Sequence, residues 1–239
     1  MLSLINKQMS RFFALMKASR SSAGQPPVAY PPPPDPATPA QQQQYERDRW
    51  NHYLLDATWR RTCFNPQPNA LLVNAVRDRP AGRALDVNMG EGRNALYLAQ
   101  LGWQVTGIDL ADQALAFAQQ RAQQLGVPLT TIAHDANTHD WGLAQWDLIV
   151  LCYADESTHV AQVPAALRPG GQLVFENFHA DINQVRGYPS GQQIGFATNE
   201  LKELYTTAGF QILHYEEPVA VADFSLETHR LVQLVAQKL

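Results

Sequence analysis

The 239-residue chain has only two cysteines, Cys63 and Cys152, and neither lies in a CxxC pattern or beside a histidine cluster. So low a count predicts free thiols and argues against a disulfide-held secreted scaffold. The seven histidines are scattered without a helical i+3 or i+4 pair, so we expect no metal site. No apolar run approaches the roughly 18 residues that span a bilayer, so we expect a soluble chain without a transmembrane segment.

Acidic residues are missing from the first 34 positions, which carry four basic residues and a charge of +4. The remaining chain has 14 basic and 22 acidic residues, a net charge of −8. Binding to a phosphate backbone needs a basic face, and an acidic main domain does not supply one. We therefore expect no nucleic acid partner.

The first 45 residues differ in composition from the rest. Apolar residues recur at helical spacing between basic ones over residues 1–20, a pattern typical of organelle-targeting peptides or membrane-surface helices. An extension without function fits this composition equally well. Pro31–Pro34 and Gln41–Gln44 then predict an extended linker. We assign 1–45 to a tail and linker and 46–239 to the folded domain. We expect a cytoplasmic location, with targeting or membrane-surface association through residues 1–20 as the alternative.

From residue 46 onward, strand and helix patterns alternate. The periodicities predict helices at 46–61, 70–77, 93–101, 111–125, 157–167 and 199–208, and strands at 83–87, 104–108, 129–133, 147–152, 172–177, 210–215 and 229–237. The last two strands are joined too closely for a parallel crossover and should pair antiparallel. The predicted fold is α/β: a doubly wound, mostly parallel, seven-stranded Rossmann-like sheet with a C-terminal antiparallel hairpin.

The segment 84–94 contains the clearest functional pattern. A strand ends at Asp86, a glycine-bearing turn follows, and a helix begins near Arg93. This arrangement presents backbone N–H groups and a helix N-terminus to a nucleotide-like ligand. Gly90 and Gly92 allow close approach and positive φ angles. Asn88 stands where such loops usually have their first glycine, but asparagine tolerates left-handed dihedrals, so the turn should survive.

The run Leu85-Asp86-Val87…Gly90-Glu91-Gly92-Arg93-Asn94-Ala95-Leu96-Tyr97-Leu98-Ala99 resembles the first motif of class I S-adenosylmethionine-dependent methyltransferases. It is most similar to the branch containing tellurite-resistance and thiopurine-type enzymes. The resemblance covers about 80–239 and adds the segments 107–109, 146–149, 167–171 and 231–238 in the same order. It implies S-adenosyl-L-methionine as cofactor and transfer of a methyl group to a small-molecule acceptor (a thiol, a metalloid oxyanion or similar) by in-line displacement.

The resemblance also implies a set of cofactor-binding residues. Asp86 would hold the loop amides or the cofactor's ammonium group, and Asp109, at the end of a strand, would accept hydrogen bonds from the ribose hydroxyls. Asp135 and Ala136 would bind the adenine ring, while the Asn88 side chain would take space at the methionine end. The full expected set is Asp86, Asn88, Met89, Gly90, Gly92, Asp109, Leu110, Asp135, Ala136 and Cys152.

Acceptor-side residues should follow the fourth and fifth strands of the sheet. These positions are Cys152, Tyr153, Asp155, Glu176, Asn177 and His179. Glu176 and His179 are the general-base candidates, and Tyr153 completes the expected catalytic set. Cys152 fits a thiol beside the cofactor better than a nucleophile. At the entry side, 59–61 and 64–66 are expected to cover the pocket, with their arginines facing an anionic acceptor or the cofactor carboxylate.

Two other interpretations stay open. The spacing Gly90-x-Gly92-x-x-Ala95 also satisfies the dinucleotide fingerprint of NAD-dependent oxidoreductases. Asp86, Asp135 and the antiparallel strand pair count against that interpretation. A catalytically silent cofactor-binding or interaction module, with a glycine loop made degenerate by Asn88, is the main alternative to an enzyme.

Overall fold

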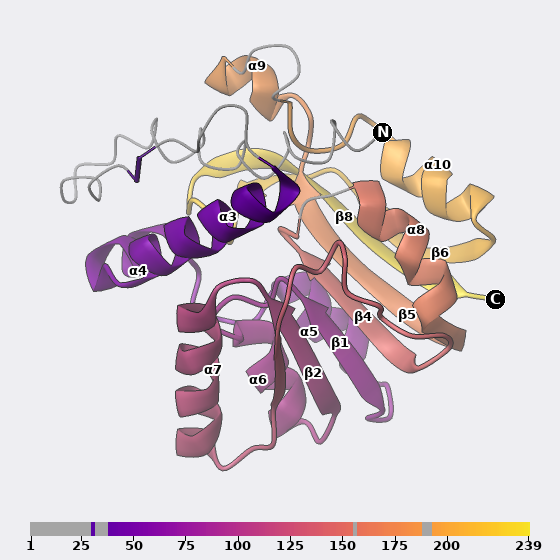
Figure 1. Cartoon of the computed structure of the whole chain (residues 1–239). Helices are drawn as coiled ribbons and strands as arrows, with labels where there is room; N and C mark the ends of the chain where they lie inside the picture. Colours follow the sequence, from indigo (N-terminus) through magenta and orange to yellow (C-terminus); the bar gives the residue numbers. More distant parts are fainter. Residues whose placement is uncertain (1–29, 32–37, 155–156, 188–192) are drawn as a thin grey trace.

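The computed structural model describes residues 30–31, 38–154, 157–187 and 193–239 (Figure 1). The amphipathic pattern expected in residues 1–20 and most of the proline-rich segment lie outside the described residues. Within the described ranges, none of the helices has both the length and the apolar character needed to span a bilayer.

One mixed sheet organises the domain, in the order β3-β2-β1-β4-β5-β8-β6, with β7 paired to β8 outside this path. The strands are β1 (Arg83–Val87), β2 (Gln104–Asp109), β3 (Thr130–Ala133), β4 (Trp146–Cys152), β5 (Leu167–Phe178), β6 (Phe210–Glu216), β7 (Val219–Val221) and β8 (Thr228–Lys238). The first five are parallel, and β8 is antiparallel to both β5 and β6. The doubly wound fold and the antiparallel end of the sheet are confirmed.

Two features of the sheet differ from the prediction. The three-residue strand β7 makes the sheet eight-stranded instead of seven-stranded, because so short a run carries no readable alternation of apolar and polar residues. The segment 168–171, which lies outside the expected strand 172–177, belongs to β5, whose pairing with β4 shifts register between Trp146 and Leu148.

Helices cover both faces of this sheet (Figure 1). They are α3 (Pro39–Leu54), α4 (Ala57–Cys63), α5 (Ala70–Val76), α6 (Arg93–Gln100), α7 (Asp112–Leu125), α8 (Ser157–Ala166), α9 (Ile182–Arg186) and α10 (Glu200–Thr207). One core cluster joins α5, α6 and α7 to the sheet, and another joins α8 and α10. In β4, Leu148 and Val150 enter the first cluster while Ile149 and Leu151 enter the second. The strand is thus buried on both faces.

The start of the folded domain corrects the sequence prediction in two places. The expected extended linker through Gln44 is helical, because α3 begins at Pro39 behind a capping box between Thr38 and Gln41. The expected single helix 46–61 is two helices. Asp56 caps the second of them, α4, by accepting hydrogen bonds from the backbone N–H groups of residues 58 and 59. α3 packs against both α4 and α7.

Candidate active site

A cavity of about 600 Å³ lies at the carboxyl ends of β1, β2 and β4. The strand order reverses between β1 and β4, and such a reversal is where open parallel sheets bind their ligands. The lining comes from the ends of these strands, from α3, α4, α6 and α7, from the segment after α4, and from the connection between β7 and β8. Its volume falls within the range of small-molecule sites.

The loop after β1 has the backbone conformation that its sequence predicts. Asn88 has φ +52° and Gly90 has φ +58°, so asparagine does hold the left-handed turn. A Cβ atom at Gly90 would meet nothing within 4 Å, so this residue faces the open cavity. A Cβ atom at Gly92 would lie 3.0 Å from the Cβ of Ala118. Gly92 therefore serves the packing of α6 on α7, and the structure does not place it in the cavity lining.

Asp109 holds this loop from the end of β2. One carboxylate oxygen accepts from the N–H of Gly90 at 2.8 Å, and the other accepts from the N–H of Ala111 at 2.8 Å. Burial raises the pKa of Asp109, and these backbone hydrogen bonds oppose the rise. Each oxygen keeps a further lone pair, so the carboxylate can shape the loop and still accept from a ligand. Leu110, the next residue, also lines the cavity.

Asp86 lies deeper, at the end of β1, and only 2% of its surface is exposed. No donor within the described residues reaches its Oδ2 atom. Burial raises the pKa of Asp86 to about 7, although the positive charge of Arg93 opposes the rise. A buried carboxylate oxygen at a cavity wall needs a donor, and a cationic ligand group would supply one. Met89 and Cys152 also line the cavity.

Asp135 and Ala136, expected at the adenine ring, do not appear in the cavity lining. One oxygen of Asp135 accepts from the N–H of Asn137 at 2.9 Å, and the other lies 3.5 Å from Nε2 of Gln43 on α3. The carbonyl of Ala136 accepts from the indole of Trp141 at 3.0 Å. Their adenine contacts stay a prediction.

Tyr153 is the one expected catalytic residue that the structure places in the cavity wall. Its φ of +59° is strained for a residue with a side chain, and such strain concentrates at functional sites. The hydroxyl accepts from the backbone N–H of Asp223 at 3.1 Å. Burial raises the pKa of Tyr153 well above its ordinary value, so the phenol stays neutral.

Glu176 lies behind Tyr153 and does not itself line the cavity. Its carboxylate accepts from Nδ2 of Asn69 and from Nε2 of Gln233, both at 2.7 Å. Burial raises the pKa of Glu176, so this carboxylate is a better proton acceptor than an exposed one.

The remaining acceptor-side candidates have other surroundings. His179 is bonded through Nε2 to the Thr198 hydroxyl at 3.0 Å and through Nδ1 to the N–H of Asp181 at 3.2 Å, outside the cavity lining. Asn177 is buried in β5 and also absent from the lining. Asp155 lies outside the described residues. Burial raises the pKa of Cys152 well above its ordinary value, so this residue presents a neutral thiol.

Asp223, which no sequence pattern singles out, is central to the other end of the cavity. Its carboxylate accepts from Nη1 of Arg93 at 2.6 Å, from Nδ2 of Asn65 at 2.6 Å and from Nδ2 of Asn69 at 2.8 Å. Backbone hydrogen bonds tie its loop to the segment after α4, at Cys63 and Asn65. Asn65 lies 158 positions away in the chain, so no local pattern connects the two residues.

Most of the residues that were expected to cover the entrance of the pocket do line the cavity. Arg60, Arg61 and residues 64–66 line the cavity, whereas Trp59 is buried in the core. Arg60 pairs with Glu91 of the glycine loop at 3.1 Å, and its guanidinium lies over the ring of Phe117, 4.1 Å from the centroid. This pair stands beside Asp109 and therefore next to the loop after β1.

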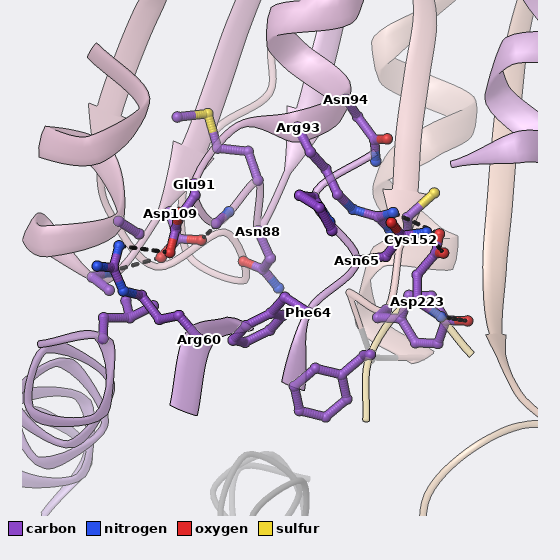
Figure 2. Close-up of a pocket in the computed structure, with 18 of the residues that line it drawn as sticks. Arg60, Phe64, Asn65, Asn88, Glu91, Arg93, Asn94, Asp109, Cys152 and Asp223 are labelled. Atoms are coloured by element: carbon purple, nitrogen blue, oxygen red, sulfur yellow. Dashed lines mark hydrogen bonds and ion pairs between the residues drawn. The ribbon is translucent and has the colours of Figure 1, made fainter. Parts of the chain in front are cut away.

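Figure 2 shows two groups of polar side chains in this cavity. Arg60, Glu91 and Asp109 lie on one side, while Arg93, Asn65, Cys152 and Asp223 lie on the other, with Asn88 and Phe64 between them. The first group stands at the end of β2, where the ribose is expected. The second group stands beyond β4, where an acceptor would lie.

The fold is Rossmann-like, and residues 84–171 match the family model described as methyltransferase domain. Together with the likeness to TehB, this match supports an S-adenosylmethionine-dependent methyltransferase close to the TehB branch. It is 27% identical over 154 residues to the probable S-adenosyl-L-methionine-dependent methyltransferase TehB of Haemophilus influenzae, covering 61% of this chain and 52% of that protein.

Two further likenesses accompany this one. A protein named Hemagglutinin 1, from Eikenella corrodens, is 28% identical over 168 residues, 67% of this chain and 54% of the relative. The crystal structure of TehB from Haemophilus influenzae superposes with a TM-score of 0.59 at 22% identity, over 72% of this chain and 62% of that one, and this shows the shared fold. The chain spans about half the length of the curated relatives it matches.

Proposed function

We propose that this protein transfers a methyl group from S-adenosyl-L-methionine to a small-molecule acceptor by in-line displacement. The observation that carries the proposal is the buried Oδ2 atom of Asp86, which has no donor within the described residues and lies at the cavity beside Asp109. Gly90, between them, leaves open space where a Cβ atom would stand. A ligand with one cationic group and two ribose hydroxyls would satisfy this set of acceptors.

The residues present fit this cofactor. Asp109 would accept from the ribose hydroxyls, Asp86 would face the ammonium group, and Leu110 would flank the base. Asn88 occupies the middle of the cavity, where it narrows the space for the methionine end (Figure 2). When bound, the cofactor supplies a methyl group on a positively charged sulfur, which is already activated for displacement.

The protein's own contribution is positioning, exclusion of water and removal of a proton. Trp50, Leu54, Phe64 and Phe224 give the cavity apolar walls that would shield the reacting atoms from solvent. Tyr153 would position the acceptor at the end of β4, and Glu176, whose pKa burial raises, would be the candidate proton acceptor. His179 is held away from the cavity, so it has no part in this step.

The alternative is a catalytically silent module that binds the cofactor without transferring its methyl group. One observation favours it: the amide of Asn88 lies in the cavity where relatives of this fold class usually have a glycine. The sequence also led us to expect a thiol or a metalloid oxyanion as the acceptor. The likeness to TehB is consistent with this expectation.

Calorimetric titration of the full chain with S-adenosylmethionine and S-adenosylhomocysteine tests the proposal. Wild type should bind both compounds. Asp109→Ala should abolish binding, because the same carboxylate holds the loop at Gly90 and would accept hydrogen bonds from the ribose. The control is Asp78→Ala, an exposed aspartate outside the cavity, which should bind like wild type. Absence of any affinity in the wild type would overturn both the enzyme and the silent module. Binding without turnover on thiols, oxyanions and aromatic hydroxyls would favour the silent module.

A further inference from the structure

An arginine group lies in the cavity wall where α4 meets α7, and it consists of Arg60, Arg61 and Arg121. Arg60 and Arg61 are consecutive residues of α4, Arg121 belongs to α7, and all of them line the cavity. The guanidinium of Arg60 lies over the ring of Phe117 on α7, 4.1 Å from its centroid. Arg121 follows Phe117 by four residues and therefore lies on the same face of that helix. The arginine group thus surrounds the contact between the two helices.

The charges of this group are only partly compensated. Glu91 accepts from Nη1 of Arg60 at 3.1 Å. Neither Arg61 nor Arg121 takes part in an ion pair within the part of the chain that the structure describes. Arg61 donates through Nη2 to a neutral partner, the Thr58 hydroxyl, at 3.3 Å. Three guanidinium charges against one carboxylate leave a net charge of +2.

One donor of the arginine group is buried without an acceptor. Nε of Arg60 has no hydrogen-bond partner among the described residues, although Nη1 of the same side chain is bound to Glu91. A buried guanidinium N–H normally has an acceptor, and a ligand oxyanion in the cavity would provide one. The planar fork of N–H groups on arginine matches the oxygens of a carboxylate or a phosphate. The arginine group therefore has the charge and the donors of an oxyanion subsite.

The carboxylate of the cofactor is expected elsewhere, on the basis of the proposed methyl transfer. Its ammonium and carboxylate groups share one carbon atom, so both lie near the same side chains. Asp86 would face the ammonium group; burial raises the pKa of Asp86, and Arg93 is the cation that opposes the rise. Among the described residues, Arg93 donates to Asp223 and Gln67 through Nη1 alone, so its other N–H groups can hold the carboxylate. Arg93 and Arg60 stand on opposite sides of the cavity (Figure 2).

An apolar wall runs from the arginine group toward the end of β4. Leu54, Phe64 and Phe117 belong to one apolar cluster, and the first two line the cavity. The ring centroid of Phe64 lies 5.2 Å from that of Phe224, which in turn lies 6.4 Å from that of Tyr153. A ligand with an apolar body can therefore reach from the arginine group to the strand end where the methyl acceptor is expected.

We propose that the acceptor is an organic molecule with an anionic oxygen group, a carboxylate or a phosphate, and that Arg60, Arg61 and Arg121 bind this group. Its apolar body lies along Leu54 and Phe64, and its reacting atom lies at the end of β4. The proposal rests on the proposed methyl transfer for the role of this ligand, whereas the oxyanion subsite itself does not depend on it.

Binding of inorganic phosphate to the full chain tests the subsite. Phosphorus NMR follows the titration at constant ionic strength, with and without saturating S-adenosylhomocysteine. Wild type should bind phosphate in both cases. The double variant Arg61→Gln with Arg121→Gln should bind it about tenfold more weakly, because two charged contacts are lost. Absence of phosphate binding in the wild type, or equal binding by the double variant, would overturn the subsite.

A second double variant controls for net charge. Arg77→Gln with Lys202→Gln also removes two positive charges, and both residues are exposed and outside the cavity lining. This protein should bind phosphate like the wild type, because distant exposed charges are screened by salt. A similar loss of affinity in both double variants would mean that phosphate responds to net charge and not to the arginine group.

A pair of aromatic ligands tests whether the anion belongs to an organic acceptor. Calorimetry with S-adenosylhomocysteine present compares 2-naphthoate with 2-naphthamide, which has nearly the same shape without the charge. Wild type should bind 2-naphthoate about tenfold more tightly, and the Arg61→Gln, Arg121→Gln protein should lose this preference. If phosphate binds but the two naphthalene compounds bind equally, the subsite takes free inorganic anions only and the inference about the acceptor is overturned.

A pair of cofactor analogues tests the other source of an anion. S-adenosylhomocysteine has the amino acid end, and 5′-methylthioadenosine lacks it. The Arg61→Gln, Arg121→Gln protein should keep the wild-type ratio of the two affinities. A loss confined to S-adenosylhomocysteine would assign the arginine group to the cofactor carboxylate and overturn the inference. If the wild type binds neither analogue, the proposed function fails, while the phosphate titration still decides whether the arginine group is an oxyanion subsite.

Discussion

The carboxylate of Asp223 lies 2.6 Å from Nη1 of Arg93, although 130 positions separate these residues in the chain. Arg93 is the first residue of α6, directly after the glycine loop, and Asp223 belongs to the connection between β7 and β8. A cation at a helix N-terminus is electrostatically unfavourable, so Arg93 needs this partner. The contact joins α6, which follows the glycine loop, to the C-terminal strands of the domain.

Removal of Arg93 should destabilise the domain more than removal of an exposed arginine. Arg93→Ala leaves Asp223 buried without its cation, and such a loss costs about 3 kcal/mol of unfolding free energy. Arg168→Ala is the control, because Arg168 pairs with Asp147 at 3.1 Å with 43% of its side chain exposed. That variant should lose less than about 1 kcal/mol. Equal losses in urea denaturation would contradict a buried, structurally important pair.

Cofactor affinity should depend on pH through Asp86. Its pKa is raised from 3.8 to about 7 in the folded protein, so the carboxyl is protonated below this value and ionised above it. A bound ammonium group favours the ionised form, so binding should release a proton and weaken as the pH falls below about 7. Calorimetry in buffers of different ionisation enthalpy measures this proton release. Asp86→Asn should lose both the release and the pH dependence.

The same pKa shift predicts how the stability of the ligand-free domain depends on pH. A carboxyl with a raised folded pKa binds its proton more tightly in the folded state, so stability falls as the pH rises from about 4 to about 7. Asp86→Asn removes the buried charge and should flatten this part of the profile. Thermal unfolding of both proteins across this window gives the comparison, and parallel profiles would show that Asp86 is not responsible.

Replacement of Asn88 by glycine should strengthen cofactor binding about three- to tenfold, because it opens space at the methionine end and relieves the left-handed backbone. Asn199 offers a matched control, since it also has a positive φ of +61° but lies away from the cavity. Asn199→Gly should give similar backbone relief without a change in affinity. Calorimetric titration of both variants separates the two effects. Weaker binding in Asn88→Gly would mean that the amide contributes a ligand contact.

Substitutions at Gly92 and Gly126 compare the cost of backbone strain with the cost of a steric clash at the added Cβ atom. Both have positive φ, +77° and +67°, so alanine at either position costs about 1 kcal/mol in backbone strain. A Cβ atom at Gly92 would also meet Ala118 at 3.0 Å, whereas one at Gly126 would meet nothing within 4 Å. Gly92→Ala should therefore be the more destabilising change, by about a further 1 kcal/mol. Equal unfolding free energies would show that α6 and α7 separate without cost.

Much of the parallel half of the domain was predictable from local patterns. β1 has the bounds read from the sequence, and α7 ends where the expected helix 111–125 does, with Gly126 in the left-handed conformation. These features rest on the apolar periodicity and on turn chemistry within a few residues. The start of α3 was misread because a proline- and glutamine-rich composition concealed a capping box at Thr38. Composition describes an average, whereas a helix start depends on two specific side chains.

The sequence by itself determined the arrangement of the proposed cofactor side of this protein, because the loop 84–94 and Asp109 lie at the ends of adjacent parallel strands and their proposed roles follow from strand order. Only the tertiary structure decided the acceptor side. It is built from four separate segments of the chain, which contribute Asn65, Arg93, Tyr153 and Asp223. The ion pair and the hydrogen bonds between these residues form only when the segments meet in the folded protein. The same folding places Glu176 behind a tyrosine and holds His179 away, a distinction that depends on three-dimensional contacts and leaves no local pattern.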